Sequence, residues 1–242
     1  MGREYKIANL GRLLLKPFLR ERSAVWKSLR NFYIKAYTIA YRAKSMIIRG
    51  IKLHITHDSI FFDDEALWMC GFSHKKKVSN VLQEFAPKNI LDIGCGLGNT
   101  VKEFRSRGIE AFGLEGSELA IRRSEVADFI QQANLNFPLD LKRKFDLVWC
   151  VEVLEHIHPK YVQNIVGTIC RHGDTLLISA APLGQHGELH FNEQPQEYWI
   201  EKFQKQGFSL DREQTSTFQK IDEEFSQSVM IFKRSLHLHV SQ

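Results

Sequence analysis

The chain has 242 residues and a formal net charge of +5, and its 43% hydrophobic and 25% charged residues are ordinary for a globular protein. The four cysteines, at positions 70, 95, 150 and 170, show neither a C-x-x-C motif nor the spacing of a disulfide framework, so we expect reduced thiols in a cytoplasmic protein. No apolar run reaches the roughly 18 residues that a membrane-spanning helix needs, and charged residues flank the short run Leu13–Leu15, so no signal peptide is expected.

The positive charge is concentrated at the N-terminus. Residues 1–53 contain thirteen Lys/Arg and two Asp/Glu, a balance of +11, whereas the remainder has a balance of −6. Apolar residues recur here every three or four positions, which predicts an amphipathic helix; they are Val25, Leu29, Phe32, Ala36, Ala40, Ala43 and Ile47. Such a basic helix covers the neighbouring domain with a solvated charged face, lies on an anionic membrane surface, or contacts nucleic-acid phosphates. Nucleic acid ranks last, because no RNA-binding signature accompanies the charge.

Residues 54–88 follow as a segment that we expect to act as a lid on the substrate side, with an irregular part over 54–72 and a helix over 74–85. From residue 89 the chain alternates between strand and helix patterns, which predicts βαβ units. Strands are predicted at 89–93, 110–115, 128–132, 145–150, 174–180, 207–214 and 226–233, and helices at 98–107, 117–124, 153–171 and 195–206. We therefore expect an α/β domain over 89–235, with a mainly parallel sheet and helices on both faces, and a tail at 236–242.

The turn after the first of these strands is the most informative motif. The sequence ILDIGCGLGNT, residues 90–100, combines a short apolar strand, three glycines at alternate positions and the start of a helical pattern. A strand, glycine turn and helix in this order form the place where α/β sheets bind nucleotide-like ligands. The dinucleotide fingerprint G-x-G-x-x-G would need its third glycine at Asn99 and is therefore absent.

The pattern D-x-G-x-G-x-G, with Asp92 two positions before Gly94, instead resembles the first motif of the class I S-adenosylmethionine (SAM) methyltransferases. The resemblance implies a Rossmann-like seven-stranded sheet and SAM as the cofactor. It also implies that the turn faces the methionine end of SAM. The residues of the motif that would bind SAM are Asp92, Gly94, Cys95, Gly96 and Gly98.

Glu115 closes the second predicted strand, 21 positions after Gly94. A carboxylate at this place is able to accept hydrogen bonds from both ribose hydroxyls. Gly116 would let the backbone pass close to the sugar. The alternative is that Glu115 is simply a surface residue at the end of a strand.

Two further pairs follow the third and fourth strands. In SAM methyltransferases an Asp or Asn after the third strand meets the adenine amino group and the next residue packs on the ring, so the resemblance assigns these roles to Asn134 and Leu135. The alternative for Asn134 is a turn residue. Cys150 and Val151 end the fourth strand beside the first, where the order of the sheet reverses and ligands bind. Cys150 is interpreted as a packed thiol near the cofactor rather than a nucleophile.

An acidic and histidine-containing cluster comes next. If residues 153–171 are helical, Glu152, Glu155 and His156 share one face and converge at the mouth of the cleft. They would bind a divalent ion, act as a general base with Glu155 and His156 as catalytic residues, or only start and pack a helix.

The sequence CVEVLEHI, residues 150–157, resembles the matching segment of ubiquinone-biosynthesis O-methyltransferases, and its E-x-x-E-H part resembles small-RNA 3′-end 2′-O-methyltransferases. In both, the resemblance implies a metal at Glu152, Glu155 and His156. The RNA enzymes add a histidine downstream, for which His190, or else His186, is the counterpart in the loop 182–195. Mg²⁺, Mn²⁺ and Zn²⁺ remain open.

The sequence thus predicts a SAM-dependent methyltransferase with a basic helical extension. We expect O-methylation of a hydroxyl on a small molecule, a glycan or a lipid-linked intermediate, with peripheral membrane association through the N-terminal helix. Methylation of RNA or protein is the first alternative. A SAM-binding module without turnover is the second.

Overall fold

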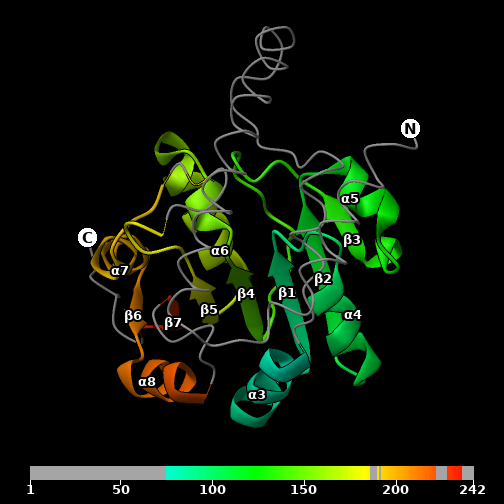
Figure 1. The fold of residues 1–242 in the computed structure, drawn as a ribbon, viewed down its shortest axis with the longest axis horizontal. Helices are drawn as coiled ribbons and strands as arrows, with labels where there is room; N and C mark the ends of the chain where they lie inside the picture. Colours follow the sequence, from blue (N-terminus) through cyan, green and yellow to red (C-terminus); the bar gives the residue numbers. More distant parts are fainter. Residues whose placement is uncertain (1–74, 186–189, 191, 222–227, 236–242) are drawn as a thin grey trace, which may run out of the picture. The chain divides into compact units, whose positions relative to one another are not determined.

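The computed structural model describes residues 75–185, 190, 192–221 and 228–235 (Figure 1). The chain divides into two units, Met1–His57 and Asp58–Gln242, and only the second contains described residues. The predicted N-terminal helix, the segment 54–72 and the tail 236–242 lie outside the described residues. Within the described residues, no helix is long and apolar enough to cross a membrane.

Seven strands form one sheet in the order β3-β2-β1-β4-β5-β7-β6. Their bounds are β1 Asn89–Ile93, β2 Glu110–Glu115, β3 Ile130–Gln132, β4 Leu147–Val151, β5 Thr175–Ser179, β6 Phe208–Leu210 and β7 Val229–Arg234. The pairs between β3, β2, β1, β4 and β5 are parallel, while β7 is antiparallel to both β5 and β6. The predicted seven-stranded, mainly parallel sheet is confirmed.

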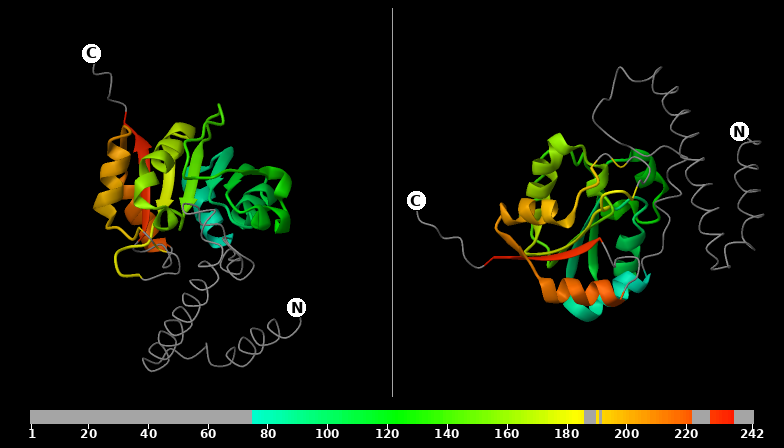
Figure 2. Two further views of the ribbon diagram at one scale, coloured as in Figure 1. Left: turned by 90° about the horizontal axis from the view of Figure 1, so that it is seen from above. Right: turned by 60° about the vertical axis from the view of Figure 1, so that its left-hand side comes forward.

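Helices cover both faces of the sheet, as Figures 1 and 2 show. The helices α3 Lys75–Phe85, α4 Asn99–Ser106 and α8 Arg212–Ile221 contribute to one buried cluster, and α6 Val162–His172 and α7 Gln196–Gln204 contribute to another. The short α5, Glu118–Arg123, contacts β2 and β3. Along β1, Ile90 faces the first cluster and Leu91 the second, which explains why this strand is a continuous apolar run instead of an alternating one.

The predicted helix over 153–171 is wrong in its first half. Two 3-10 turns, Leu154–His156 and Pro159–Tyr161, precede α6, which begins only at residue 162. The physical reason is Pro159, because a residue before proline is driven out of the helical region. His158 accordingly has an extended backbone with φ −59° and ψ 137°.

The predicted strand over 207–214 is also wrong at its end. Strand β6 stops at Leu210, and α8 was not predicted at all. Asp211 ends the strand and caps the helix, since its Oδ1 accepts a hydrogen bond of 3.0 Å from the N–H of Gln214. The sequence D-x-x-Q at 211–214 resembles a capping box and was the available signal. The other predicted elements exist, with ends shifted by a few residues.

The glycine turn packs directly against the segment that follows β4. Gly94 has φ +77°, and a Cβ placed on it would lie 2.5 Å from Cγ2 of Val153. Its N–H donates to the carbonyl of Leu114 at 2.8 Å, which ties the turn to the end of β2. Gly108 has nearly the same φ, +79°, but a Cβ there would meet nothing within 4 Å.

This contrast separates backbone strain from crowding. We expect Gly108→Ala to lose about 1–2 kcal/mol in the free energy of unfolding, the cost of a left-handed alanine. Gly94→Ala should lose about 1–3 kcal/mol more, because it overpacks the site against Val153. Denaturant unfolding of Gly108→Ala, Gly94→Ala, Val153→Ala and Gly94→Ala/Val153→Ala checks this. The double variant should be less destabilised than Gly94→Ala and Val153→Ala predict together, and simple additivity would contradict the crowding.

A buried histidine links α6 to the loop before β4. Nδ1 of His172 lies 2.7 Å from the carbonyl oxygen of Thr168, and Nε2 accepts a hydrogen bond of 2.8 Å from the N–H of Leu141. Because a carbonyl only accepts and an N–H only donates, the ring is neutral with its proton on Nδ1. Burial lowers the pKa of His172 below its ordinary 6.5.

This lowered pKa makes stability depend on pH. In the unfolded chain His172 binds a proton near pH 6.5, whereas in the folded protein it does so only at a lower pH. The neutral ring therefore contributes fully to the free energy of unfolding above pH 6.5, and this contribution is lost as the pH falls through the folded pKa. Unfolding measured from about pH 7.5 to about pH 5.5 should show this loss, and His172→Gln should flatten it. His158→Gln, at an exposed position, is the control. An unchanged slope in His172→Gln would contradict the assignment.

Candidate active site

The carboxylate of Glu115 joins the ends of β1 and β2. Its Oε2 accepts a hydrogen bond of 2.8 Å from the N–H of Gly96, and its Oε1 accepts one of 2.8 Å from the N–H of Ser117. Burial raises the pKa of Glu115, while the backbone N–H groups of Ser117, Gly96 and Gly116 act in the opposite direction. The structure therefore brings Glu115 to the glycine turn, and Glu115 is buried, not a surface residue at a strand end.

Asp92 and Cys150 lie beneath this turn, on the neighbouring strands β1 and β4. Asp92 pairs in register with Gly113 of β2 and Trp149 of β4. Burial, and then the nearby Glu115, raise the pKa of Asp92 to about 8. The thiol of Cys150 is fully buried in the core, and burial raises its pKa well above the ordinary value. This environment agrees with a packed thiol, because a nucleophilic cysteine needs a lowered pKa and access.

The two residues after β3 form a turn. The Oδ1 of Asn134 accepts a hydrogen bond of 3.0 Å from the N–H of Asn136, so the turn interpretation of this residue is confirmed. Leu135 is half-buried against the core. Contacts of these two residues with adenine remain a prediction.

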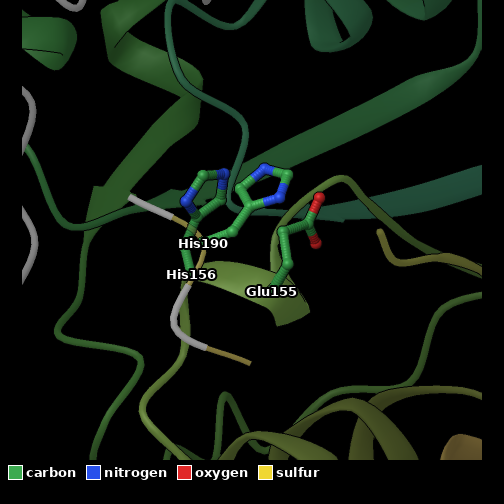
Figure 3. Close-up of side chains that lie close together, drawn as sticks. All are labelled: Glu155, His156 and His190. Carbon is green, nitrogen blue, oxygen red and sulfur yellow. The ribbon is translucent and has the colours of Figure 1, made fainter. Parts of the chain in front are cut away.

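The acidic and histidine residues converge, although not through a helical face. Glu155 and His156 lie on the 3-10 turn after β4, and His190 comes from the loop between β5 and α7. One ligand atom of each lies within 4.8 Å of the others, and Figure 3 shows the three side chains gathered together. The two imidazole rings meet edge to face with centroids 4.9 Å apart. Of the two candidate loop histidines, His190 joins the cluster, and His186 lies outside the described residues.

Glu155 is 0% exposed, and neither carboxylate oxygen has a hydrogen-bond partner among the described residues. The backbone N–H groups of Glu155 and Ala181 favour the charged form and the side chain of Glu152 disfavours it, although none of these groups makes a hydrogen bond to the carboxyl oxygens by distance and angle. Burial, and then the neighbouring Glu152, raise the pKa of Glu155 well above its ordinary value. A buried carboxyl group without a partner is costly, so this group is suited to a cation or a proton that the protein itself does not supply.

Glu152 takes a different position from the one predicted. It precedes the 3-10 turn with φ +55°, so the shared helical face does not exist. Its Oε1 accepts a hydrogen bond of 2.7 Å from the hydroxyl of Ser179, and its N–H donates to the same hydroxyl at 3.1 Å. Glu152 is not among the three residues whose ligand atoms converge.

The donor set of Glu155, His156 and His190 suits a divalent ion. Two imidazoles and a carboxylate are ligands that zinc and other first-row metals accept. Ligand atoms about 2.1 Å from one Zn²⁺ ion lie roughly 3.4 Å apart. The ligand atoms of the three residues, which lie within 4.8 Å of one another, would therefore have to move closer together to bind one ion. Both oxygens of Glu155 lack a partner within the described ranges, so they are available to a cation or a proton.

Three polar residues lie beside the cluster, and two of them, Ser179 and Glu193, were not predicted. Ser179 ends β5 opposite Val151 and contacts Glu152. Asn192 donates its N–H to the carbonyl of Glu155 at 3.0 Å. Glu193 contacts His190 at 2.9 Å. A carboxylate three residues after a candidate ligand was the only sequence signal for Glu193, and it becomes informative only once the loop is folded.

Solved structures resemble the fold. An amino pentose methyltransferase from Micromonospora echinaspora is 13% identical with a TM-score of 0.56, covering 74% of this chain and 100% of that one. Magnesium protoporphyrin IX methyltransferase from Synechocystis PCC 6803 is 16% identical with a TM-score of 0.52, covering 83% and 100%.

In sequence, the chain is 26% identical over 103 residues to the ubiquinone biosynthesis O-methyltransferase of Azoarcus sp. (strain BH72). That match covers 39% of this chain and 44% of the relative, so it spans less than half the relative's length. Residues 73–215, more than half of the chain, match the family described as methyltransferase domain. With its glycine turn, the Glu115 carboxylate beside it and this sheet order, the chain belongs to the class I SAM-dependent methyltransferases.

Proposed function

We propose that this methyltransferase transfers the methyl group of SAM to a hydroxyl oxygen of a small-molecule, glycan or lipid-linked acceptor. The observation that carries the proposal is the cluster that Glu155 and His156, after β4, form with His190 from the loop between β5 and α7, beside the point where the sheet order reverses. A hydroxyl must lose its proton during methylation, and such a cluster is able to assist that loss. The partial likeness to an O-methyltransferase adds support.

SAM carries its methyl group on a sulfonium, so attack by the hydroxyl oxygen breaks the carbon–sulfur bond and leaves the electron pair on sulfur. The protein aligns the acceptor with the methyl group and excludes water. The residues proposed to hold SAM are Asp92, Gly94, Cys95, Gly96, Gly98, Glu115, Gly116, Asn134, Leu135, Cys150 and Val151. Glu115 would exchange its backbone partners, wholly or in part, for the ribose hydroxyls.

The cluster would act in one of two forms. Without an ion, His156 takes the proton of the acceptor and Glu155 stabilises the charged ring. With a divalent ion on Glu155, His156 and His190, the ion would supply Lewis-acid stabilisation of the acceptor oxygen. The family resemblance also includes Glu152 among the metal residues. In this chain its carboxylate accepts a hydrogen bond from Ser179 and would lie next to the ion rather than among the three converging ligands.

The acceptor class is tested by a screen with methyl-labelled SAM against hydroxylated aromatic compounds, glycans, lipid-linked phenols, RNA and proteins. We expect label on a hydroxyl acceptor. Methylation of RNA or protein is the second candidate, which the +11 charge balance of residues 1–53 permits. Labelled RNA with a steep dependence on salt would replace our proposal. Binding of SAM without any labelled acceptor would favour a module without turnover.

Loss of binding to anionic vesicles on deletion of residues 1–50 would support peripheral membrane association.

Glu115→Ala should weaken SAM binding about tenfold or more, because a hydrogen bond to a charged group contributes about 1.5–3 kcal/mol. Glu115→Gln should lie between Glu115→Ala and the wild type. Glu110→Gln, at the exposed start of the same strand, is the control and should bind as the wild type does. Calorimetric titration with SAM, and with NAD as the negative ligand, measures this. Unchanged SAM affinity in Glu115→Ala would remove Glu115 from the cofactor site.

His156→Ala should lower the rate of methyl transfer roughly a hundredfold or more, the size expected when a general base is lost, and leave SAM affinity unchanged. His158→Ala, two residues further and exposed, is the control.

If an ion is used, a chelator should reproduce the loss of activity and a divalent metal should restore it. Glu155→Gln should then raise the metal concentration required more than Glu152→Gln does. Full activity of His156→Ala would reduce the cluster to a packing role.

A further inference from the structure

Glu193 connects two separate parts of the loop between β5 and α7. Its Oε2 accepts a hydrogen bond of 3.0 Å from the N–H of Gly184, near the beginning of the loop. Its Oε1 lies 2.9 Å from Nδ1 of His190. The side chains of His190 and Glu193 are only 10% and 14% exposed, so the contact between them is largely shielded from water, whereas the hydrogen bond from Gly184 lies at an exposed position.

The second contact decides which nitrogen of His190 carries a proton. A carboxylate accepts hydrogen bonds, so Nδ1 must be the donor, and Nε2 keeps its lone pair when the ring is neutral. The lone pair on Nε2 is then the one available to a ligand. With the opposite tautomer, Nδ1 would meet Glu193 with two lone pairs facing each other.

The ring of His190 belongs to the cluster with Glu155, whose buried carboxylate has no hydrogen-bond partner among the residues that the structure describes. Asn192 adds a second tie between loop and cluster, because its N–H donates to the carbonyl of Glu155 at 3.0 Å. The hydrogen bond of Asn192 therefore attaches the loop to the 3-10 turn that carries Glu155, and the contact of Glu193 fixes the ring of His190 within the loop.

We infer that Glu193 is a positioning residue that holds His190 in one tautomer and one orientation, so that Glu155, His156 and His190 together bind a divalent ion. The inference rests on the ion form of the proposed function. Histidines that bind metals commonly donate their other N–H to a carboxylate, and loss of that partner lowers metal affinity by about 10–100-fold.

The first experiment measures Zn²⁺ binding to untagged, chelator-treated, full-length protein by competition with a chromophoric chelator. Glu193→Gln should weaken binding by about 10–100-fold. The matched control is Glu197→Gln, which removes one negative charge from an exposed position four residues away and should bind Zn²⁺ as the wild type does. His190→Ala defines the contribution of this site relative to the remaining histidines of the chain.

The second experiment requires no metal. Two-bond ¹H–¹⁵N correlation spectra of the metal-free protein distinguish the two imidazole tautomers, with His190→Ala used to assign the signals. The wild type should show His190 protonated on Nδ1, and Glu193→Gln should shift the ring toward the Nε2-protonated form. A purely structural role for Glu193 would lower the melting temperature without changing the tautomer ratio.

Wild-type affinity together with an unchanged tautomer in Glu193→Gln would overturn the inference and leave the ion site standing. A wild-type spectrum showing the Nε2-protonated form would overturn it even if the variant fails to fold. Zn²⁺ binding equal in the wild type and in His190→Ala would remove the ion site and this inference with it. The calorimetric SAM titration of Glu115 variants would still report on the methyltransferase function separately.

Discussion

The parallel pairing of β4 with β1 on one side and β5 on the other is the constraint on which the candidate site depends. It places the chain segment after β4 between the glycine turn and the end of β5. Val153 consequently packs on Gly94, and Glu152 reaches the hydroxyl of Ser179. A side chain at position 94 or a shift in the register of β4 would therefore disturb the glycine turn and the segment that carries Glu152 and Glu155 at once.

Three buried carboxyl groups surround this junction: Asp92, Glu115 and Glu155. Burial is the largest cause of the raised pKa of each, because taking a charge out of water is costly. They differ in how that cost is offset. Two backbone N–H groups satisfy Glu115, whereas both oxygens of Glu155 lack a partner in the part of the chain that the structure describes. The contrast is the electrostatic reason to assign Glu155 to an external cation or proton, since a purely structural carboxyl group would be expected to have its own donors.

The loop between β5 and α7 brings the last component of the cluster. A histidine on a loop has many orientations, and each must be excluded if the ring is to act at one place. Glu193 and Asn192 supply two such restraints, one on the ring of His190 and one on the backbone of Glu155. Catalytic groups are commonly carried by loops at this edge of a sheet and held by the rigid strands behind them.

The sequence by itself determined the seven strands, the glycine turn and the pairing of Glu115 with that turn, because these follow from local apolar runs and the regular geometry of βαβ units. It did not determine the conformation of residues 152–161, where Pro159 prevents the helix that the spacing of Glu152, Glu155 and His156 had predicted. It also missed α8, whose N-terminus is marked only by the cap at Asp211. Only the tertiary structure gave Glu152 its partner Ser179, selected His190 as the third member of the cluster and identified Glu193. The physical reason is that Ser179 and His190 lie on segments far from residues 152–156 along the chain, and that the contact of Glu193 with His190, three positions away, forms only once their loop is folded.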